Sequence, residues 1–173
     1  FDSSRRSEGD SARAGSSVSA KTVRFRPDCD VVELATLSEL PLEQSGWQGI
    51  GVLVVSGDYQ WDDTRDRAVQ EWVLAGGHLI LSVGKNFKEY QSSRFASWIP
   101  CKALGVISLR DLSSLESFSN ASARIPVRGR VDAIRIASET GKILASSIDG
   151  PILMKAPHGM GRVTVLGIDL NRP

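Results

Sequence analysis

The fold is decided by one stretch, Trp72-Val-Leu-Ala-Gly-Gly-His-Leu-Ile-Leu-Ser-Val-Gly84. It reads as the end of a helix, a double-glycine stop and a buried strand that ends at a sharp turn. Glycine adopts the left-handed conformation at helix ends without a steric penalty, so Gly76 and Gly77 mark the stop. In many α/β enzymes a nucleophile, often a cysteine, stands at such a turn. The helix, the glycines and the strand together indicate an α/β fold. The turn holds Ser82 and Gly84 and no cysteine, which argues against catalysis.

A second buried strand is predicted upstream, in Gly51-Val-Leu-Val-Val-Ser-Gly57. Such β-branched apolar runs are typical of parallel strands that are covered on both faces. The residues between the two strands predict a helix, because apolar side chains recur at helical spacing at Ala68, Val69, Trp72 and Val73. Asp62 or Asp63 can cap its N-terminus. Together these segments predict a βαβ unit with a right-handed crossover and parallel strands.

The rest of the chain is expected to hold short helices and then a β-rich C-terminal third. Helical turns are expected within Lys85–Trp98 and Leu112–Phe118. The expected strands are Arg124–Val127, Asp132–Ile136, Ile143–Ser146, Ile152–Ala156 and Arg162–Ile168. The glycine-rich sequence Pro157-His-Gly-Met-Gly161 is predicted to join the last two strands into a hairpin.

Composition places the chain among ordinary globular proteins. It has 173 residues, 41% of them hydrophobic and 24% charged, and a formal net charge of +1. This balance gives no strong attraction to nucleic acid or to an anionic membrane, and no segment approaches the roughly 18–20 apolar residues that span a bilayer. Residues 1–22 have little to bury and are predicted to be a disordered tail or linker, followed by a single domain over 23–173. Because the sequence begins at Phe1 rather than methionine, we expect it to be a piece of a longer protein.

Metal and cofactor motifs are not expected. The two cysteines, Cys29 and Cys101, are too few for a disulfide scaffold or a cysteine-rich zinc site, and two separate thiols are favoured over a pair. No second histidine or carboxylate stands at metal-ligand spacing from His158. Gly159-Met-Gly161 lacks the third glycine and the following helix of a dinucleotide-binding loop, so we predict neither a metal nor a cofactor.

The loops after the two predicted parallel strands are the expected ligand-binding region, because open α/β sheets bind ligands at the carboxyl ends of their strands. The residues predicted to line this cleft are Ser56, Gly57, Asp58, Ser82, Gly84 and Lys85. Asp169, which follows the last predicted strand, occupies a similar position. For Asp58, polarity at the entry to the following helix explains the residue equally well, and a similar alternative applies to Asp169.

Ser82 and His158 are the weak candidates for catalysis. A nucleophile elbow usually has the pattern Gly-x-nucleophile-x-Gly. Gly84 fits, but bulky Ile80 takes the place of the first glycine. A serine also needs a base close by, and the candidate for that base is His158 in the late hairpin. A packed or loop-exposed serine and a solvent-facing turn histidine are the simpler interpretations.

Two signatures carry a resemblance to a known family. They are Glu71-Trp-Val-Leu-Ala-Gly-Gly-His-Leu-Ile-Leu81 and His158-Gly-Met-Gly-Arg-Val-Thr-Val-Leu-Gly-Ile-Asp169. With the βαβ unit, they resemble the class I glutamine amidotransferase-like domains, more narrowly those of large bacterial membrane-anchored proteins. The resemblance implies a flavodoxin-like three-layer sandwich with a mostly parallel central sheet. It also places a catalytic cysteine at the elbow that holds Ser82 or Gly84 here, and the His-Pro-Glu end of the family's triad has no match, because glycine and methionine follow His158.

The resemblance therefore implies a non-catalytic binding or scaffold module within a larger bacterial envelope protein. Its partners would be other domains of the parent protein, a protein partner or a small molecule, with no nucleic acid and no direct membrane insertion by this segment. Two alternatives stay open: a serine hydrolase with Ser82 as nucleophile and His158 as base, and a domain that binds a nucleotide or sugar. A cytoplasmic location also stays open.

Overall fold

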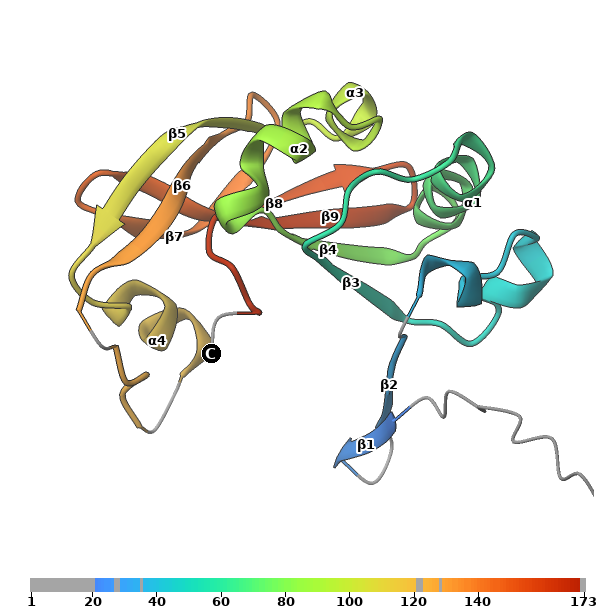
Figure 1. Ribbon diagram of the computed structural model, residues 1–173, viewed down its shortest axis with the longest axis horizontal. Helices are drawn as coiled ribbons and strands as arrows, with labels where there is room; N and C mark the ends of the chain where they lie inside the picture. Colours follow the sequence, from blue (N-terminus) through green and yellow to red (C-terminus); the bar gives the residue numbers. More distant parts are fainter. Residues whose placement is uncertain (1–20, 27–28, 35, 121–122, 128, 172–173) are drawn as a thin grey trace, which may run out of the picture. The chain divides into compact units, whose positions relative to one another are not determined.

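The computed structural model describes residues 21–26, 29–34, 36–120, 123–127 and 129–171 (Figure 1). The chain divides into two compact units, Phe1–Leu40 and Pro41–Pro173. Each unit is described by itself.

The first unit contains an antiparallel hairpin. Its strands are β1 (Lys21–Arg26) and β2 (Cys29–Glu33), and Val23 lies opposite Val31. A short 3-10 helix, η1 (Leu37–Glu39), follows. Most of the tail predicted for residues 1–22 lies outside the described residues, and its last two residues belong to β1.

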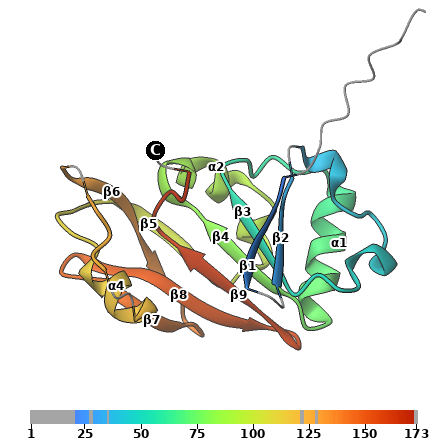
Figure 2. The ribbon, with the colours of Figure 1, turned by 90° about the horizontal axis from the view of Figure 1, so that it is seen from below.

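The second unit is built on a mixed sheet of five strands in the order β3-β4-β9-β8-β7. The strands are β3 (Val52–Ser56), β4 (His78–Ser82), β9 (Gly161–Leu166), β8 (Gly150–His158) and β7 (Lys142–Ser147). β3, β4 and β9 are parallel, whereas β8 and β7 are antiparallel to their neighbours. Figure 2 shows β4, β9 and β8 side by side. The chain therefore has an α/β fold with a mixed sheet.

The predicted βαβ unit is present, with α1 (Asp63–Leu74) between β3 and β4. Asp62 is the N-cap, and its side chain accepts hydrogen bonds from the backbone N–H groups of Thr64 and Arg65. The Arg65 amide and side chain hold the pKa of Asp62 below its usual range. The predicted apolar side of the helix, which includes Val69 and Val73, is buried.

Two glycine-rich segments meet at the end of α1. The hairpin between β8 and β9 turns at Gly159 and Met160, since His158 lies opposite Gly161. Gly159 has φ +60°, as expected for the first central residue of a type II′ turn. The Met160 N–H donates to the carbonyl of Leu74 at 3.0 Å. The two sequence signatures therefore pack directly on each other.

Seven further elements in the described residues complete the second unit. They are η2 (Gln44–Trp47), η3 (Gly84–Asn86), α2 (Phe87–Ser92), α3 (Phe95–Trp98), β5 (Lys102–Leu109), α4 (Ser113–Ser119) and β6 (Val131–Ala137). β5 and β6 form a separate antiparallel pair. In Figure 1, α1, α2 and α3 lie on one side of the sheet, and α4 lies on the other side near β7.

One expected strand is absent from the described part of the structure and one observed strand was not expected. Residues 124–127 form no strand; they include Pro126, which has no N–H to donate to a ladder. β5 was not expected at all, and it supplies half of the separate pair.

Candidate functional site

The carboxyl ends of β3 and β4 bring the predicted cleft residues together. Ser56 and Ser82 are partners in the parallel ladder. Gly57 follows β3, and Gly84 and Lys85 follow β4 within η3. These residues therefore lie together at the carboxyl ends of the two strands.

Ser82 is fixed by backbone groups of the segment that follows β9. Its side chain is 2% exposed. The Oγ donates to the carbonyl of Ile168 at 2.7 Å and accepts from the N–H of Leu170 at 2.9 Å. A hydroxyl has one proton to donate, and that of Ser82 is given to a carbonyl rather than to a base. This arrangement is that of a structural serine.

Gly84 allows the same segment to approach. Its φ is +33°, and a Cβ at this position would lie 2.6 Å from the Asp169 Cβ. Asp169 is 8% exposed, and the Lys85 Nζ lies 3.1 Å from its Oδ2. The residue after the last strand thus occupies the space beside the turn, and Lys85 neutralises its charge.

Two asparagines tie the loops of this edge together. The Asn171 Nδ2 donates to the carbonyl of Ser56 at 3.1 Å, and the Asn86 Nδ2 donates to the carbonyl of Gly57. Tyr59 adds a buried hydrogen bond at 2.6 Å to the carbonyl of Ser82, and burial raises the pKa of its hydroxyl. Sequence reasoning missed these three residues.

Asp58 serves the local backbone. Its side chain is exposed, and its Oδ1 accepts from the N–H of Gln60 at 2.8 Å. The Trp61 Nε1 donates to the Asp58 carbonyl at 3.0 Å. These bonds shape the loop that leads into α1.

His158 does not lie near Ser82. His158 lies opposite Gly161 of β9, whereas Ser82 lies opposite Leu166, five residues further along that strand. At a rise of about 3.3 Å per residue, these positions are more than about 13 Å apart. The His158 ring packs instead on Trp98, with centroids 4.8 Å apart, and burial lowers its pKa. In this structure His158 therefore does not lie within hydrogen-bond reach of Ser82, as the hydrolase interpretation would require.

The other histidine is equally distant from the turn. His78 begins β4, and its Nε2 lies 2.9 Å from the Thr164 Oγ1. Burial lowers its pKa, and the positive charges of Arg162 and Lys155 lower it further. Neither histidine in the chain is placed to activate Ser82.

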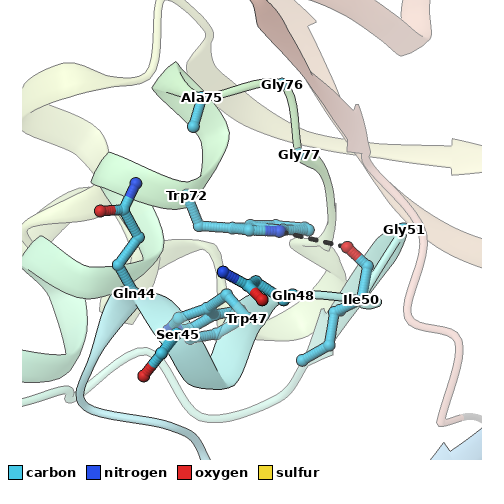
Figure 3. A pocket seen from close by; sticks show the side chains of 10 residues that line it. All are labelled: Gln44, Ser45, Trp47, Gln48, Ile50, Gly51, Trp72, Ala75, Gly76 and Gly77. Carbon is cyan, nitrogen blue, oxygen red and sulfur yellow. Dashed lines mark hydrogen bonds between the residues drawn. The ribbon is translucent and has the colours of Figure 1, made fainter.

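A pocket of about 670 Å³ that the sequence did not indicate lies at the other ends of β3 and β4. Ile50 and Gly51 precede β3, and Gly76 and Gly77 precede β4, so the pocket lies at the amino ends of these strands. Its lining consists of Gln44, Ser45, Trp47, Gln48, Ile50, Gly51, Trp72, Ala75, Gly76 and Gly77 (Figure 3).

Two tryptophans form the inner wall of this pocket. The rings of Trp47 and Trp72 have centroids 5.2 Å apart and are tilted by 32°. The Trp72 Nε1 donates to the carbonyl of Ile50 at 3.2 Å, and the Trp47 Nε1 donates to the carbonyl of Pro41 at 3.1 Å. Both indoles are thus buried and bonded to backbone carbonyls.

Within the described ranges, no group of three or more histidine, cysteine, aspartate or glutamate side chains is arranged to hold a metal ion. Cys101 is a buried free thiol whose pKa is raised by burial; the side chain of Cys29 lies outside the described part. No described helix is long and apolar enough to cross a membrane.

Comparison with protein families found no match, and comparison with curated proteins found none either. Among solved structures, the fold is similar to cytoplasmic protein STM1381 from Salmonella typhimurium LT2, with a TM-score of 0.57 and 14% identity over 78% of this chain and 67% of that chain. Cytoplasmic protein STM3548 from Salmonella typhimurium gives a TM-score of 0.54 and 15% identity, over 75% of this chain and 65% of that one. A β-galactosidase from Bacillus circulans sp. alkalophilus gives a TM-score of 0.44 at 14% identity, and the match covers 68% of this chain and 20% of the enzyme. At these identities, the likeness to the two Salmonella proteins concerns the fold alone.

Proposed function

We propose that this chain is a non-catalytic binding or scaffold module of the class I glutamine amidotransferase-like kind, with a flavodoxin-like three-layer arrangement. The observation that carries the proposal is the bonding of Ser82. Its hydroxyl proton is donated to the carbonyl of Ile168, and no histidine lies near it. Amide hydrolysis of this type needs an activated nucleophile and a positioned base.

The covered carboxyl ends of β3 and β4 support the same conclusion. In an open α/β sheet the carboxyl ends of the strands leave a crevice for a ligand. Here Asp169 and Asn171 occupy that place and bond to the strand ends and their loops. Such a module has the fold of an enzyme, but a substrate cannot reach the place where the reaction would occur.

The test is an assay of glutaminase and esterase activity with the wild-type chain and with Ser82→Ala. We expect neither protein to exceed the uncatalysed rate. Activity in the wild type that disappears in a folded Ser82→Ala variant would refute the proposal and would support the alternative of a serine hydrolase.

The cellular setting of the proposal is the bacterial envelope, within a larger membrane-anchored protein. The resemblance of the segments 71–81 and 158–169 to modules of such proteins supports this location. Fractionation of cells that express the full-length parent protein is the test: the parent should be recovered with the membranes, and recovery in the cytosol would contradict the location.

A second candidate function, binding of a small sugar, is favoured by the pocket at the amino edge. Its volume of about 670 Å³ lies in the range of small-molecule sites. Gln44 and Gln48 are among the residues that line it and offer amide donors and acceptors. Thermal-shift measurements with simple mono- and disaccharides test this function: stabilisation that is lost in Gln48→Ala would support it, and no shift with any of them would count against it.

A further inference from the structure

β3 forms one outer edge of the five-stranded sheet. Within the described residues, β4 is the only strand that pairs with it. A strand at such an edge presents a row of unpaired N–H and C=O groups, which is a template for a further strand. The backbone of β3 therefore has the capacity to extend the sheet.

The side chains of β3 include none of the features that oppose pairing with a further strand. The strand reads Val-Leu-Val-Val-Ser and contains no charge and no proline. Its ladder with β4 runs through five consecutive pairs without a shift in register. Val52 and Val54 are 50% and 53% exposed. Since these residues alternate with Leu53, both valines lie on the same face of the sheet.

The other outer edge shows the contrast. β7 begins with Lys142, and its ladder with β8 has shifts in register on both sides of Ala145. Charges and bulges are the usual means by which proteins protect an edge strand from association. The fold thus protects one edge of its sheet and leaves the other uninterrupted.

We propose that β3 pairs with β3 of a second copy of this chain, antiparallel and across a two-fold axis, to give one continuous sheet. Two-fold symmetry makes the paired strands antiparallel and the interface self-complementary. With the axis at Leu53, Val52 of each copy lies opposite Val54 of the other, so four half-exposed valines become cross-strand neighbours on one face. The net charge of +1 gives little long-range repulsion between copies. This inference does not depend on the proposed function.

Light scattering coupled to size-exclusion chromatography of the full 173-residue chain, from low to high micromolar concentration, tests the proposal. The wild type should reach twice the monomer mass. Val54→Lys should stay monomeric because it places a charge in the paired edge. Ile143→Lys is the matched control: Ile143 is 51% exposed on the opposite edge strand, and its variant should dimerise like the wild type.

Three outcomes overturn the proposal: a wild type that is monomeric at every concentration, a folded Val54→Lys that dimerises like the wild type, or an Ile143→Lys that abolishes the dimer as Val54→Lys does. If Val54→Lys does not fold, hydrogen exchange of the wild type decides. Amide exchange in residues 52–56 should slow as concentration rises, while exchange in β7 stays constant. Equal exchange in β3 at all concentrations overturns the pairing.

Discussion

Ser82 provides the sharpest test at the scale of single residues. Its Oγ satisfies a carbonyl of Ile168 and an N–H of Leu170 in a site that is almost fully buried. Ser82→Ala leaves both backbone groups without a partner, and an unsatisfied buried polar group costs about 1–3 kcal/mol. We therefore expect the free energy of unfolding in urea to fall by about this amount.

The control for this variant is Ser146→Ala. Ser146 is exposed on β7, so the same loss of a hydroxyl should leave the free energy of unfolding nearly unchanged. Equal stability of Ser82→Ala and Ser146→Ala would show that the buried bonds of Ser82 do not hold the segment after β9.

Gly77 is required for a different reason. A Cβ at this position would overlap the indole ring of Trp72, which lies directly over the glycine. The ring is fixed by its bond to Ile50 and cannot easily move away. Overpacking of this kind costs about 1–3 kcal/mol, so Gly77→Ala should lower the free energy of unfolding by about that much.

Gly51→Ala is the comparison for Gly77→Ala. Nothing lies within 4 Å of a Cβ built at Gly51, and its backbone is not in the left-handed region. This variant should unfold at the same urea concentration as the wild type. A similar loss in both variants would mean that the Trp72 contact is not the cause.

His78 makes stability depend on pH. Burial, together with the charges of Arg162 and Lys155, lowers its pKa below the ordinary value of about 6.5. The unfolded chain then binds a proton more readily than the folded chain. Stability is complete above about pH 6.5 and decreases as the pH falls through that value towards the lower pKa of the folded state.

Urea titrations between about pH 7.5 and about pH 5.5 check this prediction for the wild type and for His78→Gln. The variant should lose less stability on acidification. Some loss should remain, because burial also lowers the pKa of His158 and acts in the same direction. An identical pH dependence in both proteins would contradict the role of His78.

At the scale of elements, the helix cap is open to direct comparison. The sequence left Asp62 and Asp63 as alternatives, and the structure assigns the cap to Asp62, which accepts from two backbone N–H groups. Asp63 forms an ion pair with Arg94 instead, at 2.6 Å. Asp62→Ala should lower the melting temperature by a few degrees because the cap is lost, and Asp63→Ala should lower it less, since exposed ion pairs contribute little. Calorimetry checks the order, which would be reversed if Asp63 were the cap.

The βαβ unit was predictable because its signals are local. A β-branched run, a helical stripe and a double glycine each identify an element without reference to the rest of the chain. The late hairpin was predictable for the same reason, since Gly159 fixes its turn.

β5 escaped prediction because its sequence gives a weak pattern. Leu104 and Val106 are more than half exposed, and Gly105 interrupts the run where the register with β6 shifts. The opposite error occurred at residues 124–127, where apolar residues suggested a strand although Pro126 has no N–H to donate. Both errors arise because pairing with another strand, rather than local composition, decides whether a segment becomes a strand.

At the scale of the whole molecule, the sequence located the candidate site at the carboxyl ends of the strands but did not show how those ends are covered. The rule for parallel sheets placed Ser56, Ser82 and Lys85 together, with Asp169 in a similar position, because strand ends follow from strand direction. The contacts that Asp169 and Asn171 make there depend on the path of the chain after β9, which no local pattern records. For the same reason, the pocket beside Trp47 and Trp72 was not predictable, because the two rings come from separate elements.

Association through β3 would make the stability of the whole chain depend on concentration. Anything that binds the folded state and not the unfolded state raises the melting temperature by mass action, and a second copy is such a ligand. The wild-type melting temperature should therefore rise as protein concentration increases, and Ile143→Lys should follow it. Val54→Lys should melt at one temperature throughout, because its charged edge takes no partner. Scanning calorimetry over a hundredfold range of concentration measures the three slopes, and a flat wild-type slope would leave β3 as an edge strand that stays unpaired.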